Sequence, residues 1–360
     1  IMKKTLAAVA VLGAFAGTAL AADVTLYGKV DLGLQYVHQD NKGVKTDNWG
    51  LESGNSSSSR FGLKGQEQIS EDLTVGFQLE HGFNADDGSD ADSSKAFSRE
   101  SRLYVKTDYG TLDMSRFGAL DSGTGSVDVA ADFTASGTGY GTNINDQGRV
   151  FNTYSRLDNS IAYTSPEFAG MTLHAMTSLG NDQGDAKEAS SDVDRYYGLA
   201  VTGQWGNFGA GLVVSQVDRG HVQSALYDDD STNVTAGVNY DFGVAQTFLA
   251  ANYYKGGQVL DAAHSDVLAE DYSQWGVSLS VAAPIAGGKL ETAVGYASGT
   301  DDARASGADE YKVFNVGAYY SYPLSKRTYV YAGVGYDQVE DFDGEKIKTT
   351  EVISGLVHNF

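Results

Sequence analysis

The residue types on which enzymes depend are present in this sequence, but their spacing forms no recognisable catalytic set. The six histidines are scattered and none belongs to an HExxH string, which argues against a catalytic zinc site. Neither a GxGxxG nor a P-loop string occurs, and the glycine-rich run at 137–141 is better explained by loop flexibility. No local string pairs a nucleophile with its base. The sequence therefore predicts no catalytic residue, no metal centre, no cofactor and no enzyme activity.

Acidic residues dominate the charged groups, with 47 Asp and Glu against 25 Lys and Arg and a formal charge of −22. A charge of this sign disfavours nucleic acid and anionic membrane surfaces as partners. Many acids gather at 86–92 and 228–230, which we expect to be solvated loop tips. The 86–92 cluster could instead hold a divalent cation, although it lacks the EF-hand pattern. Cysteine is absent, which excludes disulfides and thiolate metal sites.

The N-terminus has the pattern of a secretory signal. Residues 3 and 4 are lysines, residues 6–16 are apolar, and residues 19–21 read Ala-Leu-Ala, a small-x-small cleavage pattern. The apolar run is too short for a resident transmembrane helix. We therefore expect residues 1–21 to be removed as a signal peptide, so that the mature chain is 22–360. Loss of the two lysines leaves 23 basic against 47 acidic residues, a formal charge of −24.

From Val24 onward, apolar and polar residues alternate with a period of two. A clear example is the stretch 274–281, where tryptophan, valine and leucine alternate with glutamine, glycine and serine. Successive side chains of a strand point to opposite faces, so each such stretch has one apolar and one polar face. About sixteen stretches of this kind can be counted, each about nine to eleven residues long, and short turns alternate with longer loops.

A secreted β-sandwich would alternate in the same way, with its apolar face turned inward. Three observations favour a membrane-spanning barrel. Small and polar residues fill the second face, as a wet lumen requires, and aromatic residues gather beside turns at 205–208, 240–242 and 319–322. The chain also ends in an alternating strand closed by Phe360. Because lipid-exposed backbone must be fully paired, such a sheet has to close on itself.

Several strings along the chain resemble those of Gram-negative general-diffusion porins, most closely the neisserial and comamonad branch. The strings are DVTLYG at 23–28, SRFGLKG at 59–65, RLDNSIAY at 156–163, SPEFAG at 165–170, YPLSKRT at 322–328 and the closing strand at 355–360. They keep the family's order from one end of the chain to the other.

The resemblance implies an all-β fold, a 16-stranded antiparallel transmembrane β-barrel that assembles as a homotrimer with one pore in each copy. In that family the third outer loop folds into the lumen and narrows it. The matching segment here is about 117–153, much the longest stretch without clear alternation. A loop of this length in a compact protein is usually functional or disordered, and we expect it to be functional.

The resemblance also implies that acidic residues of this loop face basic residues of the barrel wall. The candidate loop acids are Asp121, Asp128, Asp132 and, with less support, Asp146. The candidate wall cations are Arg60, Lys64, Arg102, Lys106, Arg116 and Arg156. Each of these could instead be a solvated loop or rim charge. Val357 stands where the family's closing strand commonly carries a basic residue, which predicts a thinner basic wall, and Phe360 matches the family's membrane-insertion signal.

The function implied is passive diffusion of small hydrophilic solutes and ions across the outer membrane of a Gram-negative bacterium. The acidic composition predicts a weak cation preference. The implied partners are two further copies of the chain, outer-membrane lipids and lipopolysaccharide, with the 86–92 acids as the place where divalent cations could bridge to lipid phosphates. A substrate-selective channel, an adhesin and an outer-membrane barrel enzyme remain as alternatives.

Overall fold

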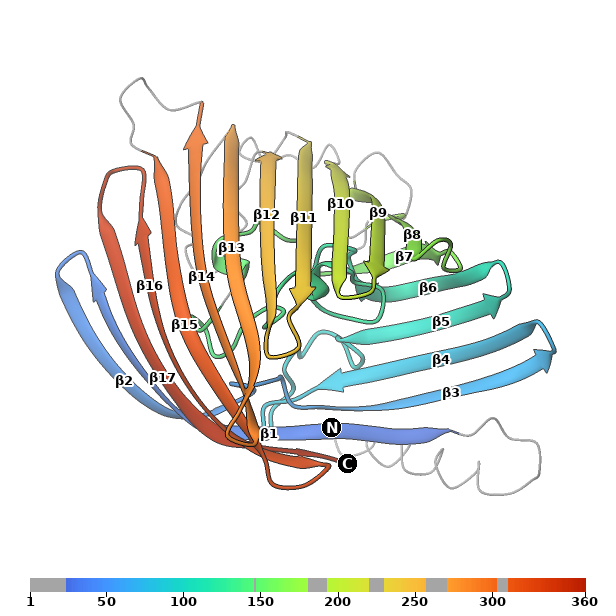
Figure 1. Ribbon diagram of the computed structural model, residues 1–360, viewed down its shortest axis with the longest axis horizontal. Coiled ribbons are helices and arrows are strands. Elements are labelled where there is room, and N and C mark those ends of the chain that lie inside the picture. The colour runs from blue at the N-terminus through green and yellow to red at the C-terminus, as the bar shows by residue number, and fades with distance from the viewer. Residues whose placement is uncertain (1–23, 146, 181–192, 220–229, 257–270, 303–309) are drawn as a thin grey trace.

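A single antiparallel sheet contains all the named strands that the structure describes (Figure 1). The computed structural model describes residues 24–145, 147–180, 193–219, 230–256, 271–302 and 310–360. The expected signal peptide at 1–21 and the candidate Asp146 lie outside these ranges. Within them, no helix is long and apolar enough to cross a membrane.

The sheet consists of seventeen strand segments in chain order. They are β1 (Thr25–Asn41), β2 (Val44–Ser53), β3 (Arg60–Ser70), β4 (Leu73–Gly82), β5 (Glu100–Thr107), β6 (Gly110–Gly118), β7 (Arg156–Thr164), β8 (Met171–Ser178), β9 (Arg195–Trp205), β10 (Phe208–Asp218), β11 (Ser231–Asp241), β12 (Gln246–Gly256), β13 (Tyr272–Ile285), β14 (Gly288–Asp301), β15 (Tyr311–Pro323), β16 (Thr328–Glu340) and β17 (Lys346–Asn359). Two short 3-10 helices, η1 (Ala130–Phe133) and η2 (Gln147–Arg149), lie between β6 and β7.

The sheet closes because its first and last strands pair. β1 and β17 are joined in continuous register from Lys29 opposite Asn359 to Asn41 opposite Ile347. On its other side β1 pairs with two segments, β2 along Leu32–Asn41 and β3 along Thr25–Lys29. β2 and β3 pair with successive parts of the same edge of β1, so together they count as one strand of the barrel. The seventeen segments therefore make a closed barrel of sixteen strands. This confirms the predicted fold.

The break between β2 and β3 is held by a buried carboxylate. Asp31, fully buried on β1, accepts hydrogen bonds from the backbone amides of Ser56 and Ser57 at 2.6 and 2.8 Å. The chain leaves β2 at Gly54, whose φ of +84° favours glycine. The serine-rich residues 54–59 therefore fold as a short internal loop beside the part of β1 where its pairing passes from β2 to β3.

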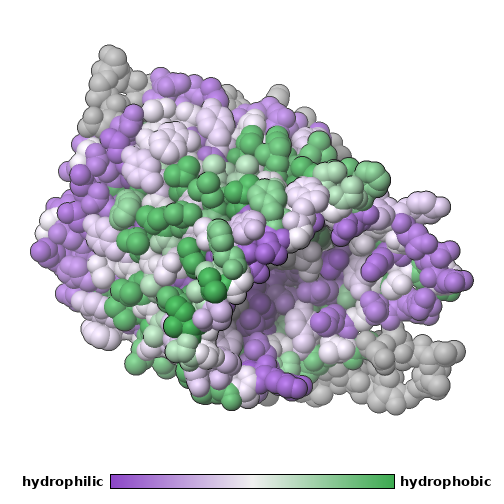
Figure 2. Space-filling view, in the orientation of Figure 1, coloured by the Kyte–Doolittle hydropathy of each residue, from purple (hydrophilic) through white to green (hydrophobic). Residues whose placement is uncertain are grey.

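The two faces of the sheet differ sharply in polarity, as the alternation predicted. On β13, Trp275, Val277 and Leu279 are about half exposed, whereas Gln274 and Ser278 are buried. The same pattern recurs around the barrel, and Figure 2 shows apolar side chains covering much of the visible outer surface. In a closed barrel this arrangement places the apolar face against lipid and the polar face around the lumen.

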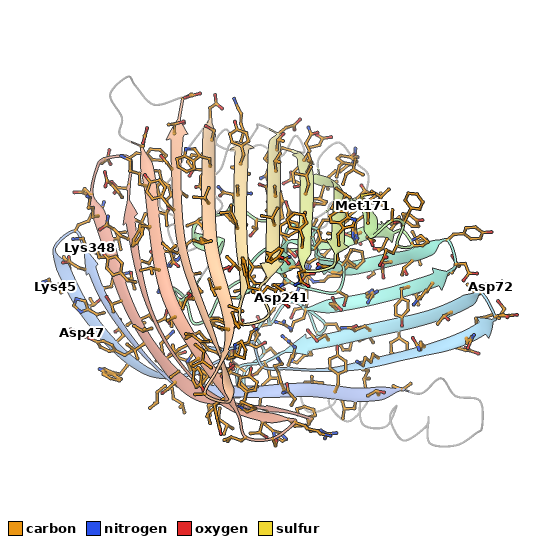
Figure 3. All side chains as sticks on the ribbon, viewed as in Figure 1. Lys45, Asp47, Asp72, Met171, Asp241 and Lys348 are labelled. Atoms are coloured by element: carbon orange, nitrogen blue, oxygen red, sulfur yellow. The ribbon has the colours of Figure 1, made fainter. Side chains whose placement is uncertain are left out.

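Most short turns lie at one end of the barrel, as expected for alternate connections in an antiparallel sheet, and the two-residue turn at 42–43 is the exception. Figure 3 shows Asp72 and Asp241 at two of the turns at this end, and Lys45 and Lys348 near the other end of the barrel, where β2 and β17 begin. Aromatic pairs flank the short turns, with ring centroids 6.2 Å apart for Trp205 and Phe208. Rings at this level suit a membrane interface, because they combine apolar and polar edges.

The longest connection runs from the end of β6 to the start of β7 and is here called the β6–β7 segment (residues 119–155). It lies on the polar face of the sheet, where its side chains contact β9–β17. Its bounds are close to the predicted loop at about 117–153, and its hydrogen bonds hold it against the barrel wall.

Candidate functional site

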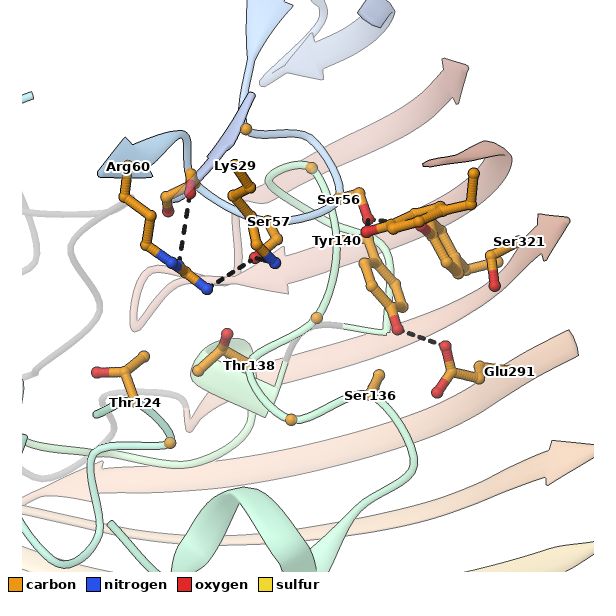
Figure 4. Close-up of a pocket in the computed structure, with 18 of the residues that line it drawn as sticks. Lys29, Ser56, Ser57, Arg60, Thr124, Ser136, Thr138, Tyr140, Glu291 and Ser321 are labelled. Atoms are coloured by element: carbon orange, nitrogen blue, oxygen red, sulfur yellow. Dashed lines mark hydrogen bonds between the residues drawn. The ribbon is translucent and has the colours of Figure 1, made fainter. Parts of the chain in front are cut away.

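A cavity of about 640 Å³ lies between the β6–β7 segment and two stretches of barrel wall (Figure 4). One wall is formed by β1, the internal loop at 54–59 and β3, and the other by β14–β16. The lining is strongly polar, with hydroxyl groups from serine, threonine and tyrosine beside charged side chains. Such a lining can replace part of the hydration of a passing solute.

Three basic side chains converge on the β1–β3 side of the cavity: Lys29, Arg60 and Arg99. The Lys29 amine donates a hydrogen bond to the Ser57 hydroxyl at 3.1 Å. Both guanidinium groups lie near Glu80, with ion-pair distances of 2.7 Å for Arg99 and 3.6 Å for Arg60. The carboxylates nearest to these cations, those of Glu80, Asp31 and Glu100, are buried and do not line the cavity. The charged side chains that line the cavity from this wall are therefore all basic.

The opposite wall is electrically closer to neutral. Lys289 and Glu291 both line the cavity and form an ion pair at 2.6 Å. Tyr140, from the β6–β7 segment, donates a hydrogen bond to Glu291 and stacks on Tyr319 with ring centroids 3.5 Å apart. Glu291 therefore connects the wall to the β6–β7 segment, and its charge is paired with that of Lys289.

The β6–β7 segment contributes small and hydroxyl-bearing residues to the cavity. Its lining stretches are 123–125 and 136–141, which consist of glycine, serine, threonine and Tyr140. Among the described residues that line this cavity, the segment supplies no carboxylate. The charge pattern is thus a basic wall facing an uncharged loop.

The candidate loop acids lie elsewhere on the segment. Asp121 is 1% exposed and accepts hydrogen bonds from Tyr196, Ser215 and Asn233, on β9, β10 and β11. Its carboxylate anchors the segment to the wall and does not face the cavity, in contrast to the expectation from the resemblance. The physical reason is that three neighbouring donors solvate this carboxylate inside the protein.

Asp128 and Asp132 also lie outside the lining of the large cavity. Asp128 accepts hydrogen bonds from the backbone amides of Gly123 and Ala131 at 2.7 and 3.0 Å, and so closes a turn within the segment. Asp132 is exposed in η1 and borders a smaller cavity of about 220 Å³ with Asn239. The structure therefore does not bring the described loop acids together.

Of the candidate wall cations, only Arg60 lines the large cavity. Arg102 pairs with Asp113 at 2.5 Å, Arg116 pairs with Asp158, and Arg156 is half-buried at the start of β7. Lys64 and Lys106 are exposed, and the Lys64 amine lies 5.0 Å from the centre of the Tyr27 ring. None of these five side chains lines the cavity, although the Arg156 guanidinium interacts electrostatically with Arg99 and Glu80 beside it.

Sequence reasoning missed Lys29, Arg99 and Lys289. Lys29 could have been found, since it shares the polar parity of β1 with Asp31 and Gln35. Arg99 precedes β5 and reaches the cavity through its pairing with Glu80, which no sequence spacing encodes.

Residues 142 and 143 of the segment are held by a second buried carboxylate, Glu351 on β17. It is fully buried and accepts hydrogen bonds from the backbone amides of Thr142 and Asn143 and from the Gln35 side chain. Val357, on the same strand, is buried in an apolar cluster with Tyr331 and Ile353. The wall at β17 therefore anchors the segment and offers the cavity no basic side chain.

Comparison with known proteins agrees with this architecture. Residues 7–341 match the family described as Gram-negative porin. An outer membrane porin protein of Bordetella pertussis is 30% identical with full coverage of both chains, and outer membrane porin protein 32 of Delftia acidovorans is 28% identical over 99% of this chain and 95% of its own. A structure described as an anion-selective porin from Comamonas acidovorans has a TM-score of 0.69 at 23% identity and covers 94% of this chain and 100% of its own.

The fold, the apolar outer face, the polar cavity and these relatives lead to one assignment. The chain belongs to the Gram-negative porin family, whose members are channels of the outer membrane and not enzymes.

Proposed function

We propose that this protein is a general-diffusion channel for small hydrophilic solutes and ions. The observation that carries the proposal is the cavity of about 640 Å³, lined by hydroxyl and charged groups within a barrel whose outer face is apolar. A lining that does not form a binding site for one particular solute selects solutes mainly by their size, and its charges modulate which ions pass.

The β6–β7 segment is the element that narrows the channel. Its stretches 123–125 and 136–141 face the basic wall across the cavity, and Asp121 and Glu351 attach it to opposite parts of the barrel. A segment attached at both places can keep the width of the channel constant.

The local charge favours anions. Lys29, Arg60 and Arg99 line the cavity, whereas the neighbouring carboxylates of Glu80, Asp31 and Glu100 are buried behind its surface. On the opposite wall, Lys289 is offset by Glu291. A unit charge about 8 Å from a passing ion contributes about 0.5 kcal/mol in water, and about 2 kcal/mol at an effective dielectric constant of 20. Charges beyond about 8 Å are largely screened at physiological salt, so the cavity outweighs distant loop acids.

The formal charge of the whole chain predicts the opposite preference, for cations. We favour the local argument, and the description of the Comamonas acidovorans structure as an anion-selective porin supports it. The expected bias is several-fold, so both ions pass.

The working unit that we propose is a homotrimer, embedded in outer-membrane lipid and lipopolysaccharide after export by a cleaved signal. A trimer form is described for OmpT of Vibrio cholerae, a structural neighbour with a TM-score of 0.64. Outward-facing Trp49 and Leu51 on β2 are 76% and 52% exposed, which leaves apolar surface for a neighbouring copy or lipid.

Planar-bilayer recording of the purified protein tests the channel. We expect stepwise conductance that grows linearly with salt, steps in groups of three, and a reversal potential in a potassium chloride gradient with the sign of anion preference. Saturable block by one solute class would favour a substrate-selective channel instead. A reversal potential of cation sign would reject the local-charge argument but leave the channel standing.

A further inference from the structure

Three apolar side chains of the β6–β7 segment are buried against glycines of the barrel wall. Phe133, Ile144 and Val150 are 4%, 0% and 1% exposed. Each lies over glycines on two adjacent strands, where the wall has no side chain of its own. We call these three pairs of glycines the glycine sockets: Gly211 with Gly237, Gly317 with Gly335, and Gly276 with Gly295.

The first socket lies on β10 and β11, where Gly211 and Gly237 are register partners. A Cβ atom at Gly211 would stand 2.3 Å from Cε1 of the Phe133 ring, and one at Gly237 would stand 2.5 Å from the Cβ of Phe133. Both distances are far below van der Waals contact, so the ring occupies the space that a side chain would need.

The second socket receives Ile144 on β15 and β16. Gly317 and Gly335 are register partners, and their added Cβ atoms would lie 3.1 Å from Cγ2 and 2.9 Å from Cγ1 of Ile144. The Cβ at Gly335 would also come within 2.7 Å of the Asn143 carbonyl oxygen.

The third socket receives Val150 on β13 and β14. An added Cβ at Gly295 would lie 2.9 Å from Cγ1 of Val150, and one at Gly276 would lie 1.9 Å from the Val150 carbonyl oxygen. That carbonyl accepts a hydrogen bond from the Gln274 side chain at 3.0 Å. The backbone of the segment therefore lies directly on the wall here.

Backbone conformation does not explain these six glycines, because none of them has a positive φ. Their strands could carry other residues, and glycine in a strand interior is unfavourable unless another chain approaches closely. The close approach of the segment is the feature that the six positions share.

We propose that the glycine sockets set the distance between the β6–β7 segment and the wall, and thereby the bore of the channel. The stretch 136–141, which lines the cavity, is held between Phe133 and Ile144, so displacement at either socket moves the lining. An added methyl group would push the segment from the wall into the lumen. This inference rests on the proposed function, since it assigns the determinants of that channel's width.

The test compares Gly211→Ala with the double variant Gly211→Ala/Phe133→Ala in planar bilayers. The single variant should lower single-channel conductance. Phe133→Ala removes the ring atoms that the new methyl group meets, so the double variant should regain the conductance of Phe133→Ala alone.

Gly237→Ala provides a matched contrast, because its new methyl group would meet the Cβ of residue 133, which alanine retains. Phe133→Ala should therefore not rescue it. Gly50→Ala on β2 is the neutral control, since the three atoms nearest to the added Cβ all belong to the movable Glu52 side chain. Its conductance should equal that of the wild type.

Gly295→Ala with and without Val150→Ala is the milder second pair, in case Gly211→Ala prevents folding. Its contacts of 2.9 and 3.1 Å involve only the valine methyl groups. Amide hydrogen exchange of residues 119–155 gives a second readout, which should rise in each single variant and fall again in the rescued double variant.

Unchanged conductance and exchange in both single variants would overturn the inference, as would a loss that Phe133→Ala and Val150→Ala fail to relieve. A folded wild-type barrel that conducts nothing would instead overturn the proposed function and, with it, any role in setting a bore.

Discussion

The carboxylate of Asp121 and the hydroxyl of Ser215 are joined by a hydrogen bond of 2.6 Å that ties the β6–β7 segment to β10. The same carboxylate accepts from Asn233 at 2.7 Å and from Tyr196 at 3.1 Å. An acidic residue that the family resemblance places at the pore thus serves, in this chain, to fix the segment that shapes the pore.

Replacing Asp121 should increase the mobility of the β6–β7 segment without unfolding the barrel. Asp121→Ala leaves three buried donors without their acceptor, and each such loss costs about 1–3 kcal/mol. We expect faster proteolysis within residues 119–155 and greater open-channel noise. Asp132→Ala, at an exposed position in η1, is the control and should behave as the wild type. Equal protease resistance of Asp121→Ala and wild type would contradict the anchoring role.

The turn closed by Asp128 should respond to pH. Burial raises the pKa of Asp128 to about 7, although three backbone amides act in the opposite direction. A folded-state pKa above the unfolded value of about 3.9 means that the folded turn binds the proton more tightly. Its stabilisation is therefore complete below about pH 4 and is lost as the pH rises through 7.

Hydrogen exchange of residues 123–131, corrected for the intrinsic rate, should accordingly show more protection at pH 5 than at pH 8. Asp128→Asn removes the titrating group and should flatten this difference. Protection that increases toward pH 8 in the wild type would show that the backbone amides dominate over burial.

The sign of ion selectivity should depend on the basic wall of the cavity. Lys29→Gln removes one positive charge at the lining. At about 8 Å in water this charge shifts the energies of an anion and a cation by about 0.5 kcal/mol each in opposite directions, which corresponds to about a five-fold change in the anion-to-cation permeability ratio. The reversal potential in a salt gradient should shift toward cations. Lys45→Gln is the matched control, because Lys45 lies near the start of β2 (Figure 3) and does not line the cavity. Equal shifts in both variants would point to the overall charge of the protein.

The terminal phenylalanine should matter for assembly. Phe360 and Gly28 exchange two backbone hydrogen bonds, at 3.0 and 3.2 Å, and the ring of Phe360 covers Gly28. Deleting Phe360 removes these contacts at the seam of the barrel and, if the residue is also the insertion signal, lowers the yield of assembled protein in the outer membrane. Phe360→Tyr, which keeps the ring, should assemble normally. Membrane fractionation with heat-modifiable gel mobility measures both, and a normal yield of the deletion variant would argue against either role.

The strands were predictable because each one carries its own signal. Alternation along Trp275, Val277 and Leu279 needs no knowledge of distant residues, and the closed sheet follows from pairing lipid-exposed backbone. The break that divides one strand of the barrel into β2 and β3 was not predictable from the sequence. It depends on Asp31 of β1, which accepts hydrogen bonds from the backbone amides of Ser56 and Ser57.

The site was less accessible to sequence reasoning than the fold. Acids within a loop can face the lumen or turn back to the wall, and the choice for Asp121 is decided by donors on three strands more than seventy positions away. Arg60 was identified because it shares the polar parity of its strand. The glycines of the sockets look, in sequence, like any other small residues of a polar face, and their meaning appears only when Phe133 is seen above them.

The seam between β1 and β17 also constrains the order of events during biogenesis. Lys29 and Asn359, which are partners there, lie near opposite ends of the chain, so this contact has almost the largest sequence separation that the protein allows. Contacts of that kind form late and slowly. Until the last strand has been added, the edges of the growing sheet stay unpaired and prone to pair with other chains. The barrel therefore cannot close before the C-terminal strand is available.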